Sequence, residues 1–258
     1  LDQPGPAREL EGSQTADWII VGAGFAGLSA ARRLTKLRPG ETVALIDAQR
    51  IGWGAAGRNS GFMIDLPHDL SSEAYGGQRE HNLAEIKLNR TAIAFAHEVA
   101  EEIGLGRNVF DACGKYHGAT DGHGIEALRA FERHLDSLGE PYTKLDASDM
   151  KRITGTDYYA GGSHMPGTTI IQPAAYVRAL AASLGKSVKI YESSPVLRFE
   201  TGREHTVHIA KGSVTAPRLI LTVNGHIESF GFFERRLMHV FLYGSMTRRL
   251  TPAEVKLL

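Results

Sequence analysis

The stretch "IIVGAGFAGLSAARRL", residues 19–34, decides the fold of this chain. Three apolar residues come first, then Gly22, Gly24 and Gly27 in a G-x-G-x-x-G pattern, and then a run with helical spacing. In a strand–turn–helix unit the first glycine permits the tight turn, the second lets the backbone approach a pyrophosphate, and the third lets helix pack on strand. Free N–H groups at the helix N-terminus favour phosphate. The stretch therefore predicts a dinucleotide site.

An acidic residue at the expected distance strengthens this prediction. Asp47 lies twenty residues beyond Gly27, at the end of "ETVALIDAQ", residues 41–49, which is predicted to be a second buried strand. A carboxylate there accepts hydrogen bonds from the ribose hydroxyls of an adenosine, and it repels a 2′-phosphate. NADP is therefore disfavoured, and NAD and FAD remain as ligands. The start of the chain is a βαβ unit with a parallel sheet.

The composition excludes several classes of protein. The 258 residues are 42% hydrophobic and carry 29 basic and 29 acidic side chains, which is typical of a globular protein with a sizeable core. A net charge of zero gives no basic excess for nucleic acid or a membrane surface, so neither is a predicted partner. The single cysteine, Cys113, excludes an internal disulfide. No apolar run approaches the roughly 20 residues that span a bilayer, and we expect a cytoplasmic protein.

The histidines and serines show no pattern of a metal or hydrolase site. His205 and His208 are three residues apart in a predicted strand, so they point to opposite faces. His117 and His123 flank a glycine-rich turn without carboxylate or cysteine partners. No nucleophile elbow is present. We therefore predict no metal site and no hydrolase chemistry.

The rest of the chain alternates helical and strand-like runs. Predicted helices cover residues 78–103, 124–139, 145–155 and 172–185. Asp146 is a predicted N-cap, and Gly139 is predicted to end the helix before it. Strand-like runs lie at 114–120, 187–193, 195–201, 206–212, 213–225 and 237–247. Thr251 before Pro252 predicts the start of a further helix.

The loop "GWGAAGRNSGFMIDLPHD", residues 52–69, follows directly on the second strand, where an NAD dehydrogenase would continue with short βα units. With this loop the chain resembles the FAD-dependent amine and amino-acid oxidoreductases of the D-amino-acid oxidase/glycine oxidase superfamily, and within it the γ-glutamylputrescine oxidase-like branch. The resemblance covers most of the chain. It is carried by "GAGFAGLSAA", "LIDAQRIGWGAAGRNSG", "IQPAAYVRALAASLG", "VKIYESSPV" and "LILTVNG", in that order.

The resemblance implies an α/β fold (α+β overall). A Rossmann-type FAD-binding domain with a parallel sheet would be interrupted by a substrate domain with an antiparallel sheet and flanking helices. We expect residues 1–16 to form an extended tail. The FAD-binding domain would comprise 17–75 and 165–228, and an incomplete substrate domain 76–164 and 229–258.

The resemblance also implies which residues meet the cofactor. The glycine turn and the segment after Asp47 would hold the pyrophosphate and the adenosine, and the loop at 57–60 would run along the ribityl chain toward the flavin ring. The backbone of Val196 would contact adenine. The cofactor-binding residues are then Gly22, Ala23, Gly24, Phe25, Ala26, Gly27, Asp47, Ala48, Gln49, Arg50, Gly57, Arg58, Asn59, Ser60, Val196, Thr222, Asn224 and Gly225.

The implied reaction is the oxidation of a C–N bond. A neutral amine or amino acid would pass hydride to flavin N5, and the resulting imine would hydrolyse. Oxygen, giving hydrogen peroxide, or another acceptor would reoxidise the flavin. Cys113 lies far from the usual covalent positions, so FAD is expected to be noncovalent. His68 is the candidate catalytic residue, since a histidine near the flavin could orient substrate or accept a proton; Asp69 follows it.

Members of this superfamily are much longer than this chain and continue well past the position that corresponds to Leu258. We therefore expect a fragment, or one chain of a two-chain protein in which a second polypeptide supplies the C-terminal half. Two other functions stay open: a non-catalytic flavin-binding subunit, and an NAD-linked dehydrogenase. A bound flavin that no amine reduces would favour the first. A nicotinamide-dependent absorbance change without a yellow chromophore would favour the second.

Overall fold

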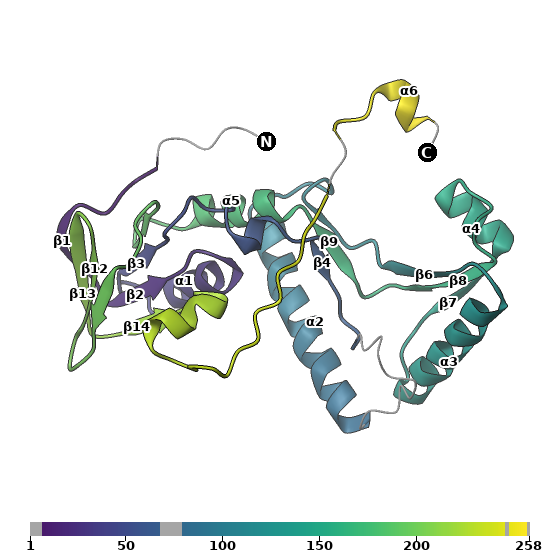
Figure 1. Ribbon diagram of the computed structural model, residues 1–258, viewed down its shortest axis with the longest axis horizontal. Coiled ribbons are helices and arrows are strands. Elements are labelled where there is room, and N and C mark those ends of the chain that lie inside the picture. The colour runs from purple at the N-terminus through teal and green to yellow at the C-terminus, as the bar shows by residue number, and fades with distance from the viewer. Residues whose placement is uncertain (1–6, 68–78, 246–247, 257–258) are drawn as a thin grey trace. The chain divides into compact units, whose positions relative to one another are not determined.

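The computed structural model describes residues 7–67, 79–245 and 248–256. The chain divides into two compact units, a first unit of Leu1–Ser60 with Gln172–Gly244 and a second unit of Gly61–Ile171 with Ser245–Leu258. Parallel and antiparallel sheets are both present, so the predicted mixed α/β architecture is confirmed (Figure 1). The domain boundaries drawn from the sequence alternate along the chain in the same order as these units, and their assignment to cofactor and substrate stays a prediction.

The first unit is built on a four-stranded parallel sheet. Its order is β10 (Val188–Tyr191), β3 (Val43–Ile46), β2 (Trp18–Val21) and β14 (Leu219–Leu221). The four residues of β3 are all buried, as expected for a strand covered on both faces. Helix α1 (Phe25–Leu37) packs against β2 and β3, and α5 (Pro173–Ser183) packs against α1 (Figure 1).

A second sheet covers the other face of the parallel sheet. Its order is β1 (Gly12–Thr15), β13 (Gly212–Ala216), β12 (His205–Ile209) and β11 (Arg198–Glu200). One core cluster includes Ile19, Ile46, Val207 and Val214, which places it between the two sheets. Strand β1 runs parallel to β13, so the last residues of the predicted extended tail are fixed in a sheet.

The second unit contains two antiparallel three-stranded sheets. One has the order β4 (Phe62–Met63), β9 (Thr169–Ile171), β5 (Phe110–Asp111). The other has the order β6 (Lys115–Ala119), β8 (Gly161–Met165), β7 (Thr143–Asp146). Helices α2 (Arg79–Glu102), α3 (Gly122–Leu138) and α4 (Ala147–Thr154) accompany them. Its core cluster combines Ile86 of α2, Phe131 and Leu135 of α3 and Met165 of β8.

The helix ends follow the predicted chemistry. The Asp146 side chain accepts the Asp149 N–H in a capping box, and Gly139 closes α3 in the left-handed region at φ +75°. Thr251 likewise caps the short helix α6 (Pro252–Val255). Of the helices in the described ranges, none combines the length and the apolar composition needed to cross a membrane.

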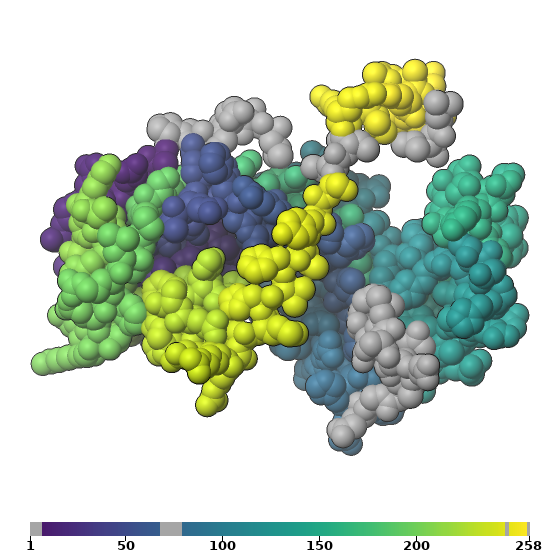
Figure 2. All heavy atoms as spheres, in the orientation of Figure 1, coloured from purple at the N-terminus to yellow at the C-terminus, as the bar shows by residue number. Residues whose placement is uncertain are grey.

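The strand predicted at 237–247 is wrong as far as the structure describes this run. After the 3₁₀ helix η2 (Asn224–Phe230), residues 231–245 form no strand or helix. Met238, Leu242 and Tyr243 are 89%, 90% and 97% exposed, and residues 237–244 lie open on the surface (Figure 2). Residues of high β-propensity form a strand only where they can pack in a sheet. No described strand pairs with this run, so its composition alone does not make it a strand.

Candidate functional site

The predicted cofactor residues gather where the strands of the parallel sheet end. Strand β2 leads into the glycine turn, β3 into Asp47, β10 into residues 192–196 and β14 into Thr222 and Asn224. Because the four strands are parallel and adjacent, their carboxyl ends share one edge of the sheet. Ligands of open α/β sheets bind in the crevice outside that edge.

Two glycines of the turn are required by packing. Gly22 has φ +102°, and a Cβ on it would overlap the carbonyl oxygen of Thr222. A Cβ on Gly27 would overlap the carbonyl oxygen of Gly22. The Thr222 hydroxyl reaches the same turn, 2.9 Å from the Val21 carbonyl oxygen and 2.8 Å from that of Gly22. Gly22, Gly27 and Thr222 therefore shape the turn from within.

Gly24 differs from these two glycines, because its missing side chain leaves room on the protein surface. A Cβ there would meet only the Cβ of Ala56, at an ordinary 3.5 Å, and its backbone is extended at φ −83°. Packing and dihedral angles would both accept alanine. Gly24 is also the N-cap of α1 and supplies no side-chain acceptor, and the first turn of α1 has no acidic residue. The first-turn N–H groups can therefore receive an anion.

Asp47 faces the glycine turn with a fixed carboxylate. Its Oδ2 accepts the Ala23 N–H at 2.7 Å, and its Oδ1 accepts the Gln49 N–H at 2.8 Å. Asp47 itself is half-buried, Ala23 is 3% exposed, and Ala48 and Gln49 are exposed. An ionised carboxylate has about four lone-pair sites, so two acceptor positions are left for hydroxyl groups. The arrangement suits a ribose beside a phosphate.

The loop at residues 52–60 forms a compact turn next to α5. It contains the 3₁₀ helix η1 (Ala55–Gly57), and a Cβ on Gly57 would overlap the backbone of Gly52. The Asn59 Nδ2 donates to the carbonyl oxygens of Ala55 and Ala56, at 3.2 and 3.0 Å. Arg58 and Ser60 are exposed, and among the described residues the Arg58 guanidinium has no hydrogen bond or ion pair. Arg58 thus offers a positive charge to solvent.

The remaining predicted residues lie on the elements that begin or end near this edge, and their contacts are mainly with other parts of the protein. The Phe25 ring lies 6.2 Å from the ring of Tyr176 on α5, and burial raises the pKa of that tyrosine while Arg32 opposes the rise. Ala26 is exposed on the first turn of α1. Val196 packs against the core between the sheets. Asn224 adopts φ +52°, and Gly225 lies against the His239 ring.

Two residues that the sequence analysis did not single out join the site. Glu192 and Ser194 follow β10 as Asp47 follows β3. Glu192 contacts the segment after Asp47, and Ser194 contacts Asp47 itself. The sequence signal for Glu192 is an acidic residue directly after the predicted strand "VKIY", in the same place that Asp47 has after its own strand. His68 and Asp69, the predicted catalytic residue and its neighbour, lie outside the described residues. Within 7–67, 79–245 and 248–256, no three His, Cys, Asp or Glu side chains are grouped as metal ligands.

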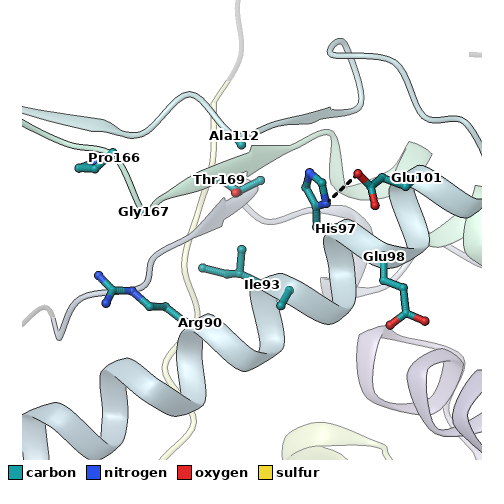
Figure 3. A pocket seen from close by; sticks show the side chains of 10 residues that line it. Arg90, Ile93, His97, Glu98, Glu101, Ala112, Pro166, Gly167 and Thr169 are labelled. Carbon is teal, nitrogen blue, oxygen red and sulfur yellow. Dashed lines mark ion pairs between the residues drawn. The ribbon is translucent and has the colours of Figure 1, made fainter.

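The second unit carries a cavity of about 390 Å³ that contains none of the predicted residues. Figure 3 shows Arg90 at one end and, at the other, His97, whose Nδ1 lies 3.5 Å from Glu101 Oε1. Hydrogen bonds to Glu140 and Asp65 raise the pKa of Arg90. The cavity is lined by Arg90, Ile93, Ala94, His97, Glu98, Glu101, Ala112, Pro166, Gly167 and Thr169.

Comparison with known proteins places this geometry in context. The family model DAO, FAD dependent oxidoreductase, matches residues 17–256. A probable oxidoreductase OrdL of Rhizobium meliloti is 30% identical over 84% of this chain and 51% of its own length. The gamma-glutamylputrescine oxidoreductase of Escherichia coli is 28% identical over 86% of this chain and 52% of its own length. The chain thus spans about half the length of the curated relatives it matches.

Solved structures show the same fold. Glycine oxidase from Geobacillus kaustophilus superposes with a TM-score of 0.65 at 21% identity, covering 81% of this chain and 55% of that protein. Likeness at this level of identity concerns the fold alone. It confirms the expected architecture of the sheet whose carboxyl edge is described above.

Proposed function

The chain belongs to the DAO family of FAD-dependent oxidoreductases, and we propose that it binds FAD at the carboxyl edge of its parallel sheet and oxidises the C–N bond of an amine or amino acid. One observation carries the location of the site. Gly24 leaves space for a ligand at a helix N-terminus, and the Asp47 carboxylate is bonded to the same turn, 2.7 Å from the Ala23 nitrogen. Helix N–H donors for a phosphate and a carboxylate that can accept from ribose hydroxyls are therefore adjacent.

The residues present fit an adenine dinucleotide. The pyrophosphate would lie against Gly24 and receive the first-turn N–H groups of α1, which carry the positive end of the helix dipole. The ribose hydroxyls would donate to the two remaining acceptor positions of Asp47. Ala48 and Gln49 are exposed beside it and would border the adenine.

The loop at 57–60 would continue the site toward the flavin. Arg58 is exposed and unpaired within the described part of the chain, so a phosphate oxygen is a natural partner for its guanidinium. The Asn59 side chain donates to two carbonyl oxygens of η1, which fixes that side chain against the turn. We propose that Gly57, Arg58, Asn59 and Ser60 line the ribityl chain.

Bound FAD would supply a two-electron acceptor for hydride from the carbon next to the substrate nitrogen. The chain's own contribution is to bind the dinucleotide and fix its orientation, which brings the reacting atoms together. The similar proteins include a gamma-glutamylputrescine oxidoreductase and a glycine oxidase, which supports an amine or amino acid as substrate. His68 stays the proposed group for substrate contact or proton transfer. We also propose that residues beyond this chain, in further length or in a second polypeptide, complete the substrate pocket.

Gly24→Ala tests the site. A methyl group at Gly24 should leave the apo protein as stable as before, because its only neighbour is Ala56 Cβ at 3.5 Å. The same methyl group should obstruct the pyrophosphate and weaken FAD binding about 100-fold, or roughly 2.7 kcal/mol. Quenching of flavin fluorescence measures the affinity, and urea denaturation measures the stability. Gly185→Ala is the matched control, since nothing lies within 4 Å of a Cβ there. Wild-type affinity in Gly24→Ala would contradict the site.

The reaction is tested separately on the loaded protein. We expect one member of an anaerobic panel of amines and amino acids to bleach the flavin absorbance, with an imine-derived aldehyde or keto acid as product. Intact-mass measurement of the same material shows whether a second polypeptide is present. A flavin that no member of the panel reduces would instead support a flavin-binding subunit without this activity.

A further inference from the structure

Residues 191–194, which are the last residue of β10 and the three that follow it, form a backbone brace for Asp47 and the segment after it. The Asp47 N–H donates to the Tyr191 carbonyl oxygen at 2.8 Å, and the Ser194 N–H donates to the Asp47 carbonyl oxygen at 2.9 Å. The Ser193 N–H reaches the Gln49 carbonyl oxygen at 3.3 Å. Asp47, the predicted ribose acceptor, is therefore bonded through its backbone to this brace on both sides.

Glu192 extends the brace with a side chain. Its Oε1 accepts the Ile51 N–H at 2.7 Å, and its Oε2 lies 3.9 Å from the Arg50 Nε. The Glu192 side chain is 17% exposed, so these contacts are partly shielded from water. A hydrogen bond to an ionised acceptor is about twice as strong as one between neutral groups.

The carbonyl group of the same residue, Ile51, is also held. Arg178 of α5 donates from Nε to the Ile51 carbonyl oxygen at 3.2 Å. The N–H and the carbonyl oxygen of Ile51 thus each have a charged partner, one directly after β10 and one on α5. Ile51 is itself buried, and the exposed loop toward Arg58 begins just after it.

Several contacts fix the backbone of residues 191–194. Ser193 adopts φ +51°, which is uncommon for a residue with a side chain and persists only where neighbours hold it. Ser194 is 1% exposed; its hydroxyl donates to the Glu192 carbonyl oxygen at 2.9 Å and accepts the Leu10 N–H at 3.0 Å. The Glu192 N–H donates to the Arg8 carbonyl oxygen at 2.9 Å. Glu192 therefore projects from a fixed backbone.

From these contacts we infer that Glu192 is a positioning residue for the adenosine half of the dinucleotide, acting through Arg50 and Ile51 on the segment that begins at Asp47. It holds the segment 47–51 in its binding geometry before the ligand arrives. Without it, binding must also order that segment, and the ordering entropy lowers affinity. The inference rests on the proposed function, and it assigns to Glu192 no contact with the ligand.

Glu192→Ala removes both contacts, whereas Glu192→Gln keeps an oxygen for the Ile51 N–H and loses only the charge. We expect the dissociation constant of FAD to rise about tenfold in the alanine variant and about twofold in the glutamine variant. ADP, which carries only the adenosine and phosphate end, should lose affinity by the same factors in a calorimetric titration. Glu200→Ala is the matched control, because Glu200 is an exposed carboxylate of the same unit, paired with Arg198.

Local positioning is separated from overall stability by limited proteolysis. Trypsin should cleave apo Glu192→Ala after Arg58 several times faster than the wild-type protein, and FAD should suppress the difference. Arg178→Met removes the donor to the Ile51 carbonyl oxygen, so it should also speed cleavage after Arg58. This variant replaces Glu192→Ala in the test if Glu192→Ala does not fold. Unchanged ADP affinity and cleavage rate in folded Glu192→Ala or Arg178→Met would overturn the inference. A wild-type protein that binds neither FAD nor ADP would instead overturn the proposed function.

Discussion

Asp47 in the first unit and Asp65 in the second each lie within two residues of a strand end, and they are held by opposite means. Asp47 accepts backbone N–H groups from Ala23 and Gln49 and stays half-buried, with lone pairs to spare. Asp65 is 1% exposed and is bonded by the Arg90 side chain at 2.9 and 3.1 Å. Backbone donors fix a carboxylate and leave it available to a ligand, whereas a side-chain cation neutralises it for burial.

The largest effect is expected at the turn that faces Asp47. Gly27→Ala should destabilise the protein by more than about 4 kcal/mol or prevent folding, because the new Cβ overlaps the Gly22 carbonyl oxygen and backbone cannot move aside cheaply. Urea denaturation followed by circular dichroism measures the change. Gly24→Ala is the control in the same turn and should be nearly neutral in the apo protein. Equal stability of the two variants would show that the turn is not set by packing.

The second-largest effect is expected at the buried carboxylate. Arg90→Met leaves Asp65 charged and enclosed, and it also removes a partner of Glu140, so the free energy of unfolding should fall by about 3 kcal/mol. Arg107→Met is the matched control. It breaks the pair with Asp111, in which the arginine is 84% exposed, and should cost less than about 1 kcal/mol. Similar losses in both variants would contradict the contrast drawn between enclosed and exposed pairs.

The first of these two regions was predictable from sequence and the second was not. The glycine turn and Asp47 follow from spacing within one βαβ unit, where the chain itself brings the residues together. The bond from Thr222 to Gly22 spans 200 residues, and the sequence flagged Thr222 only through a family resemblance. Asp65, Arg90 and Glu140 meet across three separate segments of the second unit, and charged residues at such distances carry no local pattern.

Two further outcomes show where local patterns fail. The run at 237–247 has strand composition, but a strand exists only with a partner, and the described residues offer none. Glu192 stands in a stretch used for the resemblance, yet its role depends on the neighbouring strand β3 and on Arg178 of α5. Composition and spacing report on one segment at a time, whereas both cases depend on pairs of segments.

A third carboxylate, Asp17, extends the comparison to the other end of β2. Its Oδ2 accepts the N–H and the hydroxyl of Thr42 at 2.7 and 2.8 Å, and these bonds lower the pKa of Asp17 below 3.8. A lowered pKa in the folded state means that the stabilisation is present above 3.8 and is lost as pH falls through the folded-state pKa. Asp17→Asn should therefore cost about 1 kcal/mol at pH 7 and flatten the acid limb of the stability curve. An unchanged slope between pH 5 and 2 would contradict the role of Thr42.

The smallest effect, with the opposite sign, is expected at Lys115 near Asp65. The Lys115 Nζ is buried and has no hydrogen-bond partner among the described residues, and burial lowers the pKa of the amine although Asp65 opposes the change. A lowered amine pKa means that the unfolded chain binds the proton more readily, so stability rises with pH between the folded-state pKa and 10.5. Lys115→Met keeps the side-chain length without the buried charge. It should leave the protein equally stable or up to about 1 kcal/mol more stable at pH 7, and the alkaline rise should disappear. A loss of stability in Lys115→Met of more than about 1 kcal/mol would mean that the ammonium, like Arg90, is needed to neutralise Asp65. Asp65 would then be held by two cations rather than one.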